Sequence, residues 1–344
     1  MSVTLHALFE ETLSYLLAPV RELLADERVS EVMINGPAEI YAERAGRIER
    51  THLAFADDGA LEAAARGIAQ FSGKRLTNEE LSLEARLPDG SRVHIVQPPA
   101  ARNGLCIAIR KFAKSKLGID DLVARGALTQ EAAELLIAAV KVRKNIIVSG
   151  GTGSGKTTLL NCLSAQIPSY ERILVIEDTT ELRLQQEHVV QLEAQHADRF
   201  GRGGISIREL FRASLRMRPD RILVGECRGG EALDMIQAMT SGHAGSLSTC
   251  HADTPADALA RLEVMSLMAG VDLPLAALRA QIASAVDLIV QVARLSDGTR
   301  CTTQVSQVQR LDEHQRYVIE SLFERDHVPG APLRATGARP SWFR

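Results

Sequence analysis

The chain has 344 residues and a formal net charge of −3, and 45% of its residues are hydrophobic and 24% charged. This length suits about two globular domains, and the charge excludes a generally basic, nucleic-acid-binding surface. Five scattered cysteines, none in a C-x-x-C pair, argue against a zinc site or disulfide framework and favour a reducing compartment. Neither a cleaved signal nor an uncharged apolar run of membrane-spanning length is recognisable. We therefore expect a cytoplasmic protein that associates with membranes peripherally, through partners.

Residues 1–110 show the pattern of a small α+β domain. Apolar positions at helical spacing predict helices over 5–25 and 60–72. Short alternating runs predict a strand over 31–37, a hairpin over 39–50, a second hairpin turning on Asp89-Gly90, and a further strand over 106–109. The basic segment 110–116 that follows is either a solvated linker or an element that contacts a phosphate or a neighbouring part, and we place the interdomain linker at 111–118.

Residues 119–326 alternate predicted strands and helices. Strands are expected over 145–149, 172–178, 221–226, 246–251, 288–292, 301–311 and 317–323. Helices are expected over 129–142, from 158, and over 206–217, 230–241, 255–268 and 274–285. Such alternation predicts an α/β domain with a parallel sheet covered on both faces, whose ligands bind at the carboxyl ends of the strands. Residues 327–344, rich in Pro, Gly and Arg, are expected to form a disordered tail.

A phosphate-binding loop follows the first of these strands. Residues 150–157 read G-G-T-G-S-G-K-T, which fills every fixed position of G-x-x-x-x-G-K-[ST] between a predicted strand and a predicted helix. Glycines let the backbone N–H groups approach phosphate oxygens, Lys156 supplies a cation for the β- and γ-phosphates, and Thr157 supplies a hydroxyl for Mg²⁺. The residues expected to bind nucleotide here are Gly151, Thr152, Gly153, Ser154, Gly155, Lys156, Thr157 and Thr158.

Acids and histidines end the neighbouring predicted strands. Glu226 ends an apolar strand, where a carboxylate can hold the water shell of Mg²⁺ and orient an attacking water. Glu177 and Glu181 end another strand as a candidate catalytic base and a candidate magnesium ligand. His251 and His243 bracket a Gly/Ser/Thr-rich stretch, and we expect His251 to donate to the γ-phosphate and His243 to contact nucleotide.

With these residues in place, the sequence resembles the secretion and pilus-assembly ATPases of the type II/type IV secretion superfamily. Within it, the likeness is greatest to the CpaF/TadA-like motor of tight-adherence (Flp) pili. The matching segments are V-S-E-V-M-I-N-G-P (29–37), A-R-L-P-D-G-S-R-V (85–93), I-R-K-F (109–112), S-G-G-T-G-S-G-K-T-T (149–158), I-E-D-T-T-E-L (176–182), R-M-R-P-D-R-I-L-V-G-E-C-R-G-G-E-A (216–232) and T-S-G-H-A-G-S-L-S-T-C-H-A-D (240–253).

The resemblance implies a homohexameric ring of RecA-like ATPase domains, each carrying a smaller N-terminal domain, which hydrolyses ATP with Mg²⁺ at an inner-membrane platform protein. It places Lys156 and Thr157 in Walker A and Glu226 in Walker B, where Gly225 replaces the usual preceding acid. It also implies that Arg92 and Arg110 of the N-terminal domain reach the nucleotide. The segments Glu177–Glu181 and His243–His251 match the family's acidic and histidine boxes.

Three alternatives remain beside pilus assembly. The same ATPase could serve conjugation or type II/IV protein secretion, because none of these residues separates the machines. A nucleotide-dependent binding switch with negligible turnover is disfavoured by Glu226. A DNA-translocating motor is disfavoured by the acidic net charge.

Overall fold

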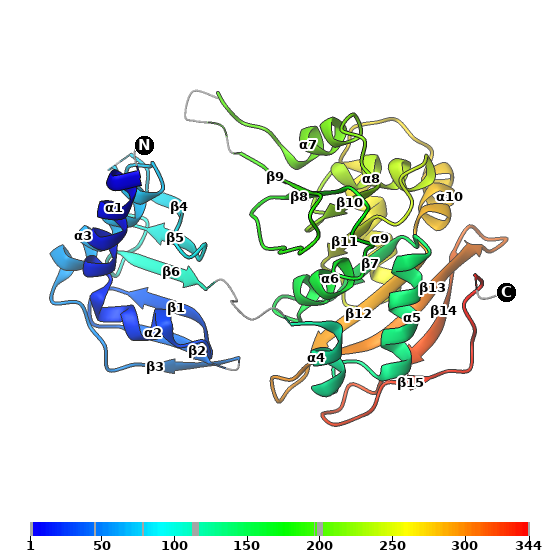
Figure 1. The fold of residues 1–344 in the computed structure, drawn as a ribbon, viewed down its shortest axis with the longest axis horizontal. Helices are drawn as coiled ribbons and strands as arrows, with labels where there is room; N and C mark the ends of the chain where they lie inside the picture. Colours follow the sequence, from blue (N-terminus) through cyan, green and yellow to red (C-terminus); the bar gives the residue numbers. More distant parts are fainter. Residues whose placement is uncertain are drawn as a thin grey trace. The chain divides into compact units, whose positions relative to one another are not determined.

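The computed structural model describes residues 3–44, 46–77, 79–111, 117–195, 197 and 202–342, which form two compact units, 1–116 and 117–344 (Figure 1). Most of the expected linker, residues 112–116, lies outside the described residues. The described chain is a mixed α/β structure in which each unit has its own sheet and its own buried apolar core.

The first unit is a six-stranded antiparallel sheet in the order β3-β2-β1-β6-β5-β4. Its strands are β1 (Val29–Asn35), β2 (Ile40–Arg44), β3 (Arg47–Arg50), β4 (Ser82–Arg86), β5 (Arg92–Val96) and β6 (Cys106–Arg110). Its helices are α1 (Val3–Leu16), α2 (Arg21–Ala25) and α3 (Asp58–Phe71). The single helix expected over 5–25 is broken instead, because Pro19 lies in a short 3₁₀ turn between α1 and α2 and cannot continue the hydrogen-bond ladder.

The second unit has a nine-stranded sheet in the order β15-β14-β13-β12-β7-β11-β10-β8-β9. The strands from β12 to β9 in this order pair in parallel, and β13, β14 and β15 extend the sheet with antiparallel pairs. The strands are β7 (Ile146–Ser149), β8 (Ile173–Glu177), β9 (Val189–Glu193), β10 (Arg221–Val224), β11 (Leu247–Cys250), β12 (Leu288–Arg294), β13 (Arg300–Leu311), β14 (Tyr317–Glu324) and β15 (Arg334–Ala335). The parallel sheet expected from the alternating elements is therefore present.

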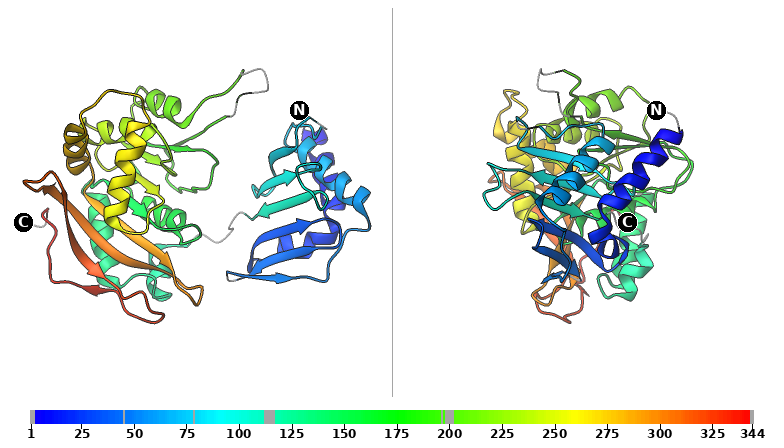
Figure 2. Two further views of the ribbon diagram at one scale, coloured as in Figure 1. Left: turned by 180° about the vertical axis from the view of Figure 1, so that it is seen from behind. Right: turned by 90° about the vertical axis from the view of Figure 1, so that its left-hand side faces the viewer.

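Helices cover both faces of this sheet, as a buried parallel sheet requires. One face carries α4 (Ile119–Ala124), α5 (Gln130–Lys141) and α6 (Lys156–Ser164), whose apolar residues share one core with the sheet. The other carries α7 (Ile207–Ser214), α8 (Glu231–Thr240), α9 (Pro255–Leu267) and α10 (Leu275–Ala285) over a second core. Figure 1 shows α5 and α6 in front of the sheet, and the reverse view in Figure 2 shows α9 in front of it.

The segment expected to be a disordered tail packs on the second unit. Residues 334–335 pair with β14, Leu333 is buried, and the ring of Trp342 lies 5.1 Å from the Lys144 ammonium. The segment docks although its average composition is polar, because Leu333 and Trp342 pack against the apolar core of this unit.

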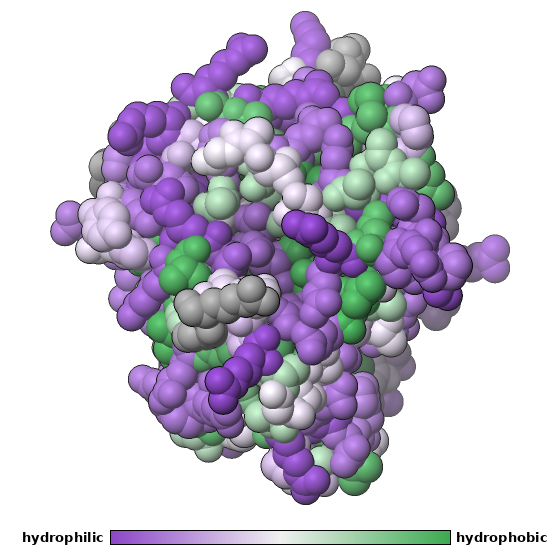
Figure 3. Space-filling model, turned by 90° about the vertical axis from the view of Figure 1, so that its right-hand side faces the viewer, coloured by the Kyte–Doolittle hydropathy of each residue, from purple (hydrophilic) through white to green (hydrophobic). Residues whose placement is uncertain are grey.

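The surface includes scattered apolar residues. Within the described parts of the chain, no helix has the length and apolar character needed to cross a bilayer. On the face drawn in Figure 3, hydrophilic residues cover most of the surface and hydrophobic ones form separate small groups. In the second unit, large exposed apolar side chains gather along α9 and the connection to α10, namely Val264, Leu267, Met268, Val271 and Leu275.

Candidate functional site

The phosphate-binding loop joins β7 to α6 at the carboxyl edge of the parallel sheet. Gly153 and Gly155 adopt φ values of +68° and +99°, a left-handed conformation that glycine takes without strain. The N–H groups in the first turn of an α-helix point toward its N-terminal end, which for α6 is the end that joins the loop. A helix N-terminus directed at a glycine-rich loop fits an anion such as the phosphates of a nucleotide.

Lys156 lies within this loop. Its ammonium donates to the carbonyl oxygens of Gly150 and Gly151 at 3.0 and 2.8 Å, and the residue is 8% exposed. The charge is therefore held against the carbonyl groups at the start of the loop. Thr157 and Thr158, the next two residues of α6, are partly buried beside it. The structure thus places Lys156, Thr157 and Thr158 together at the start of α6, beside the glycines of the loop.

A chain of polar contacts connects Lys156 to the end of β10. The Lys156 ammonium lies 3.4 Å from His251 Nδ1, and His251 Nε2 lies 2.9 Å from Glu226 Oε1. Burial, followed by the nearby Lys156 charge, lowers the pKa of His251, which favours the neutral imidazole. A neutral ring with its proton on Nε2 satisfies both contacts, because Nδ1 then accepts from Lys156 and Nε2 donates to Glu226.

Arg228 holds the other oxygen of Glu226. Its guanidinium donates to Glu226 Oε2 at 2.8 Å and lies 3.8 Å from a carboxylate oxygen of Asp178. Glu226 is 23% exposed, so it is oriented by two partners and still open to solvent. A carboxylate in that position can accept a proton from, or orient, a water molecule above the loop.

Glu177 has a different environment from Glu226. It is buried, and its Oε1 accepts from the backbone N–H groups of Glu181 and Leu182, each at 3.0 Å. Burial raises its pKa to about 7 despite these two bonds. A Cβ at Gly225 would lie 2.8 Å from Glu177 Cγ, so the side chain of Glu177 fills the space that an acid at position 225 would need.

The two histidines lie at opposite edges of the sheet. His251 follows β11 directly, next to the loop, whereas His243 precedes β11 by four residues. Near His243, the N–H groups of Gly245 and Ser246 donate to the side chain of Asn145, which comes immediately before β7. The expectation that His243 contacts nucleotide at the loop of its own chain is therefore wrong, because the length of β11 separates the two.

Arg92 and Arg110 lie opposite each other in the first unit, as cross-strand partners of β5 and β6. Arg110 Nε is 3.8 Å from Glu31 Oε1 on β1. The structure thus gathers the two predicted arginines on one sheet, where their cationic groups can act together.

Mg²⁺ would have to be held jointly by protein and nucleotide. Among the described residues, no group of three or more His, Cys, Asp or Glu side chains is arranged to hold a metal ion. Mg²⁺ is commonly bound through one or two carboxylates or hydroxyls plus substrate phosphates. Thr157 and Glu226 near the loop, with Glu181 on the turn after β8, fit that donor set.

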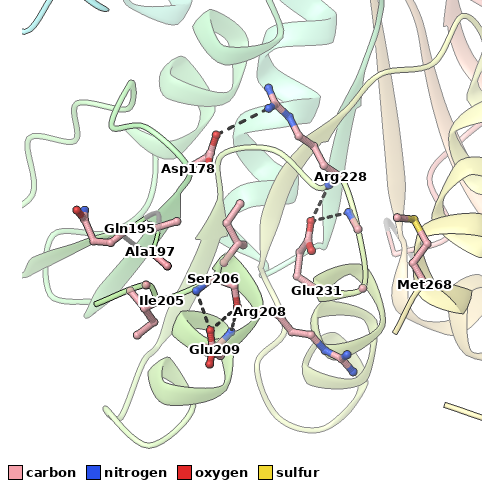
Figure 4. A pocket seen from close by; sticks show the side chains of 15 residues that line it. Asp178, Gln195, Ala197, Ile205, Ser206, Arg208, Glu209, Arg228, Glu231 and Met268 are labelled. Atoms are coloured by element: carbon pink, nitrogen blue, oxygen red, sulfur yellow. Dashed lines mark hydrogen bonds and ion pairs between the residues drawn. The ribbon is translucent and has the colours of Figure 1, made fainter. Parts of the chain in front are cut away.

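A cavity of about 800 Å³ lies beside this network and contains none of the loop residues (Figure 4). Glu231 in its wall accepts from the N–H groups of Arg228 and Gly229, and Glu209 is bonded to Ser206. These carboxylates are used to cap α8 and α7, so we place the chemistry at the open loop and not in the cavity.

Arg300 is a neighbour of the loop that the sequence did not reveal. It lies at the start of β13, and its Nε donates to the carbonyl of Gly153 at 2.8 Å. Gln291 on β12 is a second one, bonded to the Ser149 hydroxyl and, at 2.9 Å, to the carbonyl of Ala252. Both lie more than 100 residues after the loop, and no local pattern marks them.

Comparison with known proteins gives one consistent result. The family described as type II/IV secretion system protein matches residues 15–322. Type IV secretion system protein PtlH of Bordetella pertussis is 38% identical over 83% of this chain and 91% of its own length. Type IV secretion system protein VirB11 of Bartonella henselae is 33% identical over 88% of this chain and 96% of its own. The Legionella pneumophila ATPase DotB, 19% identical over 89% of this chain and 82% of its own, has a similar fold with a TM-score of 0.61.

Proposed function

The chain belongs to the type II/IV secretion system protein family, and we propose that it is the ATP-hydrolysing motor of a type IV secretion or conjugation machine. The two type IV secretion relatives favour this function over assembly of a tight-adherence pilus, the finer expectation from the sequence. Pilus assembly therefore becomes an outcome of the test below.

The observation that carries the proposal is the connection from Lys156 through His251 to Glu226. It joins the group that would meet the γ-phosphate to the carboxylate that would orient water, through a histidine that contacts both. Phosphoryl transfer to water needs these two functions and positive charge on the developing anion. A binding switch with negligible turnover does not need an oriented carboxylate beside the phosphate loop.

Each site residue then has a role. The loop, Gly151 to Thr158, binds the triphosphate of ATP through backbone N–H groups and Lys156. Glu226 orients the attacking water, and His251 responds to the γ-phosphate. Thr157, Glu226 and Glu181 would hold Mg²⁺ together with the phosphates, and the ion would neutralise charge on the phosphates. Glu177 is better placed to hold the turn that carries Glu181 than to meet substrate, since it is buried.

Assembly completes the proposal. Arg92 and Arg110 would supply positive charge from the N-terminal unit, and hydrolysis would be coupled to motion of that unit in a homohexameric ring. Burial of the exposed apolar residues along α9 and the connection to α10 would favour contact between subunits. The ring would work in the cytoplasm, docked on an inner-membrane platform protein.

The experiment that tests the machine is made in cells. Lys156→Ala removes the charge at the centre of the loop, so export or conjugative transfer should stop while the protein is still expressed and folded. Surface pili counted in the same cells separate the two machines. Loss of pili with normal export would overturn the secretion assignment in favour of pilus assembly.

A further inference from the structure

The β12–β13 hairpin lies directly against the phosphate loop. β12 pairs in parallel with β7, so that Gln291 lies opposite Ser149, the last residue before the loop. A Cβ at Gly150 would meet the carbonyl oxygen of Val292 at 2.2 Å, which shows how closely β12 approaches the start of the loop. The hairpin therefore supports the loop from a part of the chain far away in sequence.

Arg300 extends this support to the middle of the loop. Its Nε donates to the Gly153 carbonyl at 2.8 Å. Its Cδ and Cβ lie 3.8 and 3.9 Å from the position that a Cβ would occupy if Gly155 carried one. Arg294, its cross-strand partner, has a guanidinium nitrogen 3.9 Å from the place of a Cβ at Gly153. Arg300 thus holds Gly153 through a hydrogen bond, and its aliphatic stem borders the space next to Gly155 that a side chain there would enter.

Glycines are conformationally permissive, so an external contact can select one shape of the loop. A glycine peptide turns at little steric cost, and a loop that exposes its N–H groups can as readily turn a carbonyl oxygen inward. An inward carbonyl would repel a phosphate and remove a donor. A hydrogen bond that holds the Gly153 carbonyl outside therefore favours the arrangement that binds anions.

We propose that Arg300 is a positioning residue for nucleotide binding, which fixes the Gly153 carbonyl so that the loop keeps its phosphate-binding shape. The inference rests on the proposed function and adds to it a residue outside the loop, the acidic box and the histidine box. It assigns the effect to the hydrogen bond made by Nε and not to the positive charge of the guanidinium.

Two uncharged variants of similar length separate these causes. In Arg300→Gln the amide nitrogen stands as many bonds from Cα as Nε does, so the variant keeps a donor without the charge. Arg300→Met places a methyl group at that position and keeps neither. Arg310→Ala is the matched control, because it removes an exposed arginine from the far end of the same strand.

Binding of MgADP and MgATP to the full chain is measured by calorimetry, together with KM, kcat and the unfolding temperature. We expect Arg300→Gln and Arg310→Ala to bind within about twofold of wild type, and Arg300→Met to bind about tenfold more weakly with a matching rise in KM. Neither kcat nor the unfolding temperature should change comparably, since the bond supports binding and not the fold as a whole.

Other outcomes overturn the inference in distinguishable ways. Equal weakening of Arg300→Gln and Arg300→Met would assign the effect to charge, and wild-type binding in both would show that the bond does not matter. In either case the proposed function would still stand if the wild-type chain binds nucleotide and the Lys156→Ala variant does not. A wild-type chain that binds no nucleotide would overturn the proposed function and the inference together.

Discussion

Replacing Glu177 with Gln should remove a pH dependence of stability. The carboxyl of Glu177 has an ordinary pKa of 4.5 and a pKa of about 7 in the folded chain, because it is buried. Between these values the unfolded chain loses the proton while the folded chain keeps it, so rising pH favours unfolding. At 1.36 kcal/mol per unit, the folded state loses about 3 kcal/mol between pH 4 and pH 8.

Gln is the matched replacement because its carbonyl oxygen can accept from the same N–H groups of Glu181 and Leu182 without titrating. Urea unfolding of the second unit, followed at pH 4 and pH 8, should show wild type losing about 3 kcal/mol more than Glu177→Gln across that range. Other titrating groups cancel in the difference between the variants. The same pH dependence in both would refute the assignment of a raised pKa to this buried carboxyl.

Three further predictions concern the surroundings of the loop. Gly225→Ala should destabilise the second unit by about 1–3 kcal/mol, because the new Cβ collides with the side chain of Glu177. Urea unfolding measures this change, and unchanged stability would show that Glu177 can move aside without cost. Gln291→Leu removes the bonds to the Ser149 hydroxyl and the Ala252 carbonyl, so the free energy of unfolding should fall by about 2–4 kcal/mol and ATP turnover should slow. A fully active and equally stable variant would contradict this prediction. Chelation of Mg²⁺ should stop turnover without lowering the unfolding temperature, and a large drop would point to a structural metal.

Contiguous features of the site could be predicted from the sequence. The phosphate loop is a single segment between a strand and a helix. The carboxyl ends of neighbouring parallel strands meet at one edge of the sheet, so the order of strands along the chain is enough to place Glu226 and His251 near the loop. The same order argument applies to His243, because the strand expected over 246–251 lies between the two histidines. The expectation for His243 was wrong because that strand separates it from the loop.

The remainder depends on packing that no local pattern encodes. Gly225 reads as a departure from the usual acidic pair until Glu177 is seen to fill its space. Arg300 contacts Gly153 from 147 residues away, across a hairpin whose register the sequence does not specify. The docking of the C-terminal segment was not predicted, because the average composition of that segment is polar and does not indicate that Leu333 is buried.

The most direct test of the account is ATP hydrolysis by purified Glu226→Gln. Gln keeps the size of the side chain and a hydrogen-bond acceptor for His251, but it cannot take a proton from water. MgATP should bind about as tightly as to wild type while turnover falls by about 10²-fold or more. Turnover at the wild-type rate would contradict the role of Glu226, and with it the central claim that the contacts from Lys156 through His251 form the hydrolytic site.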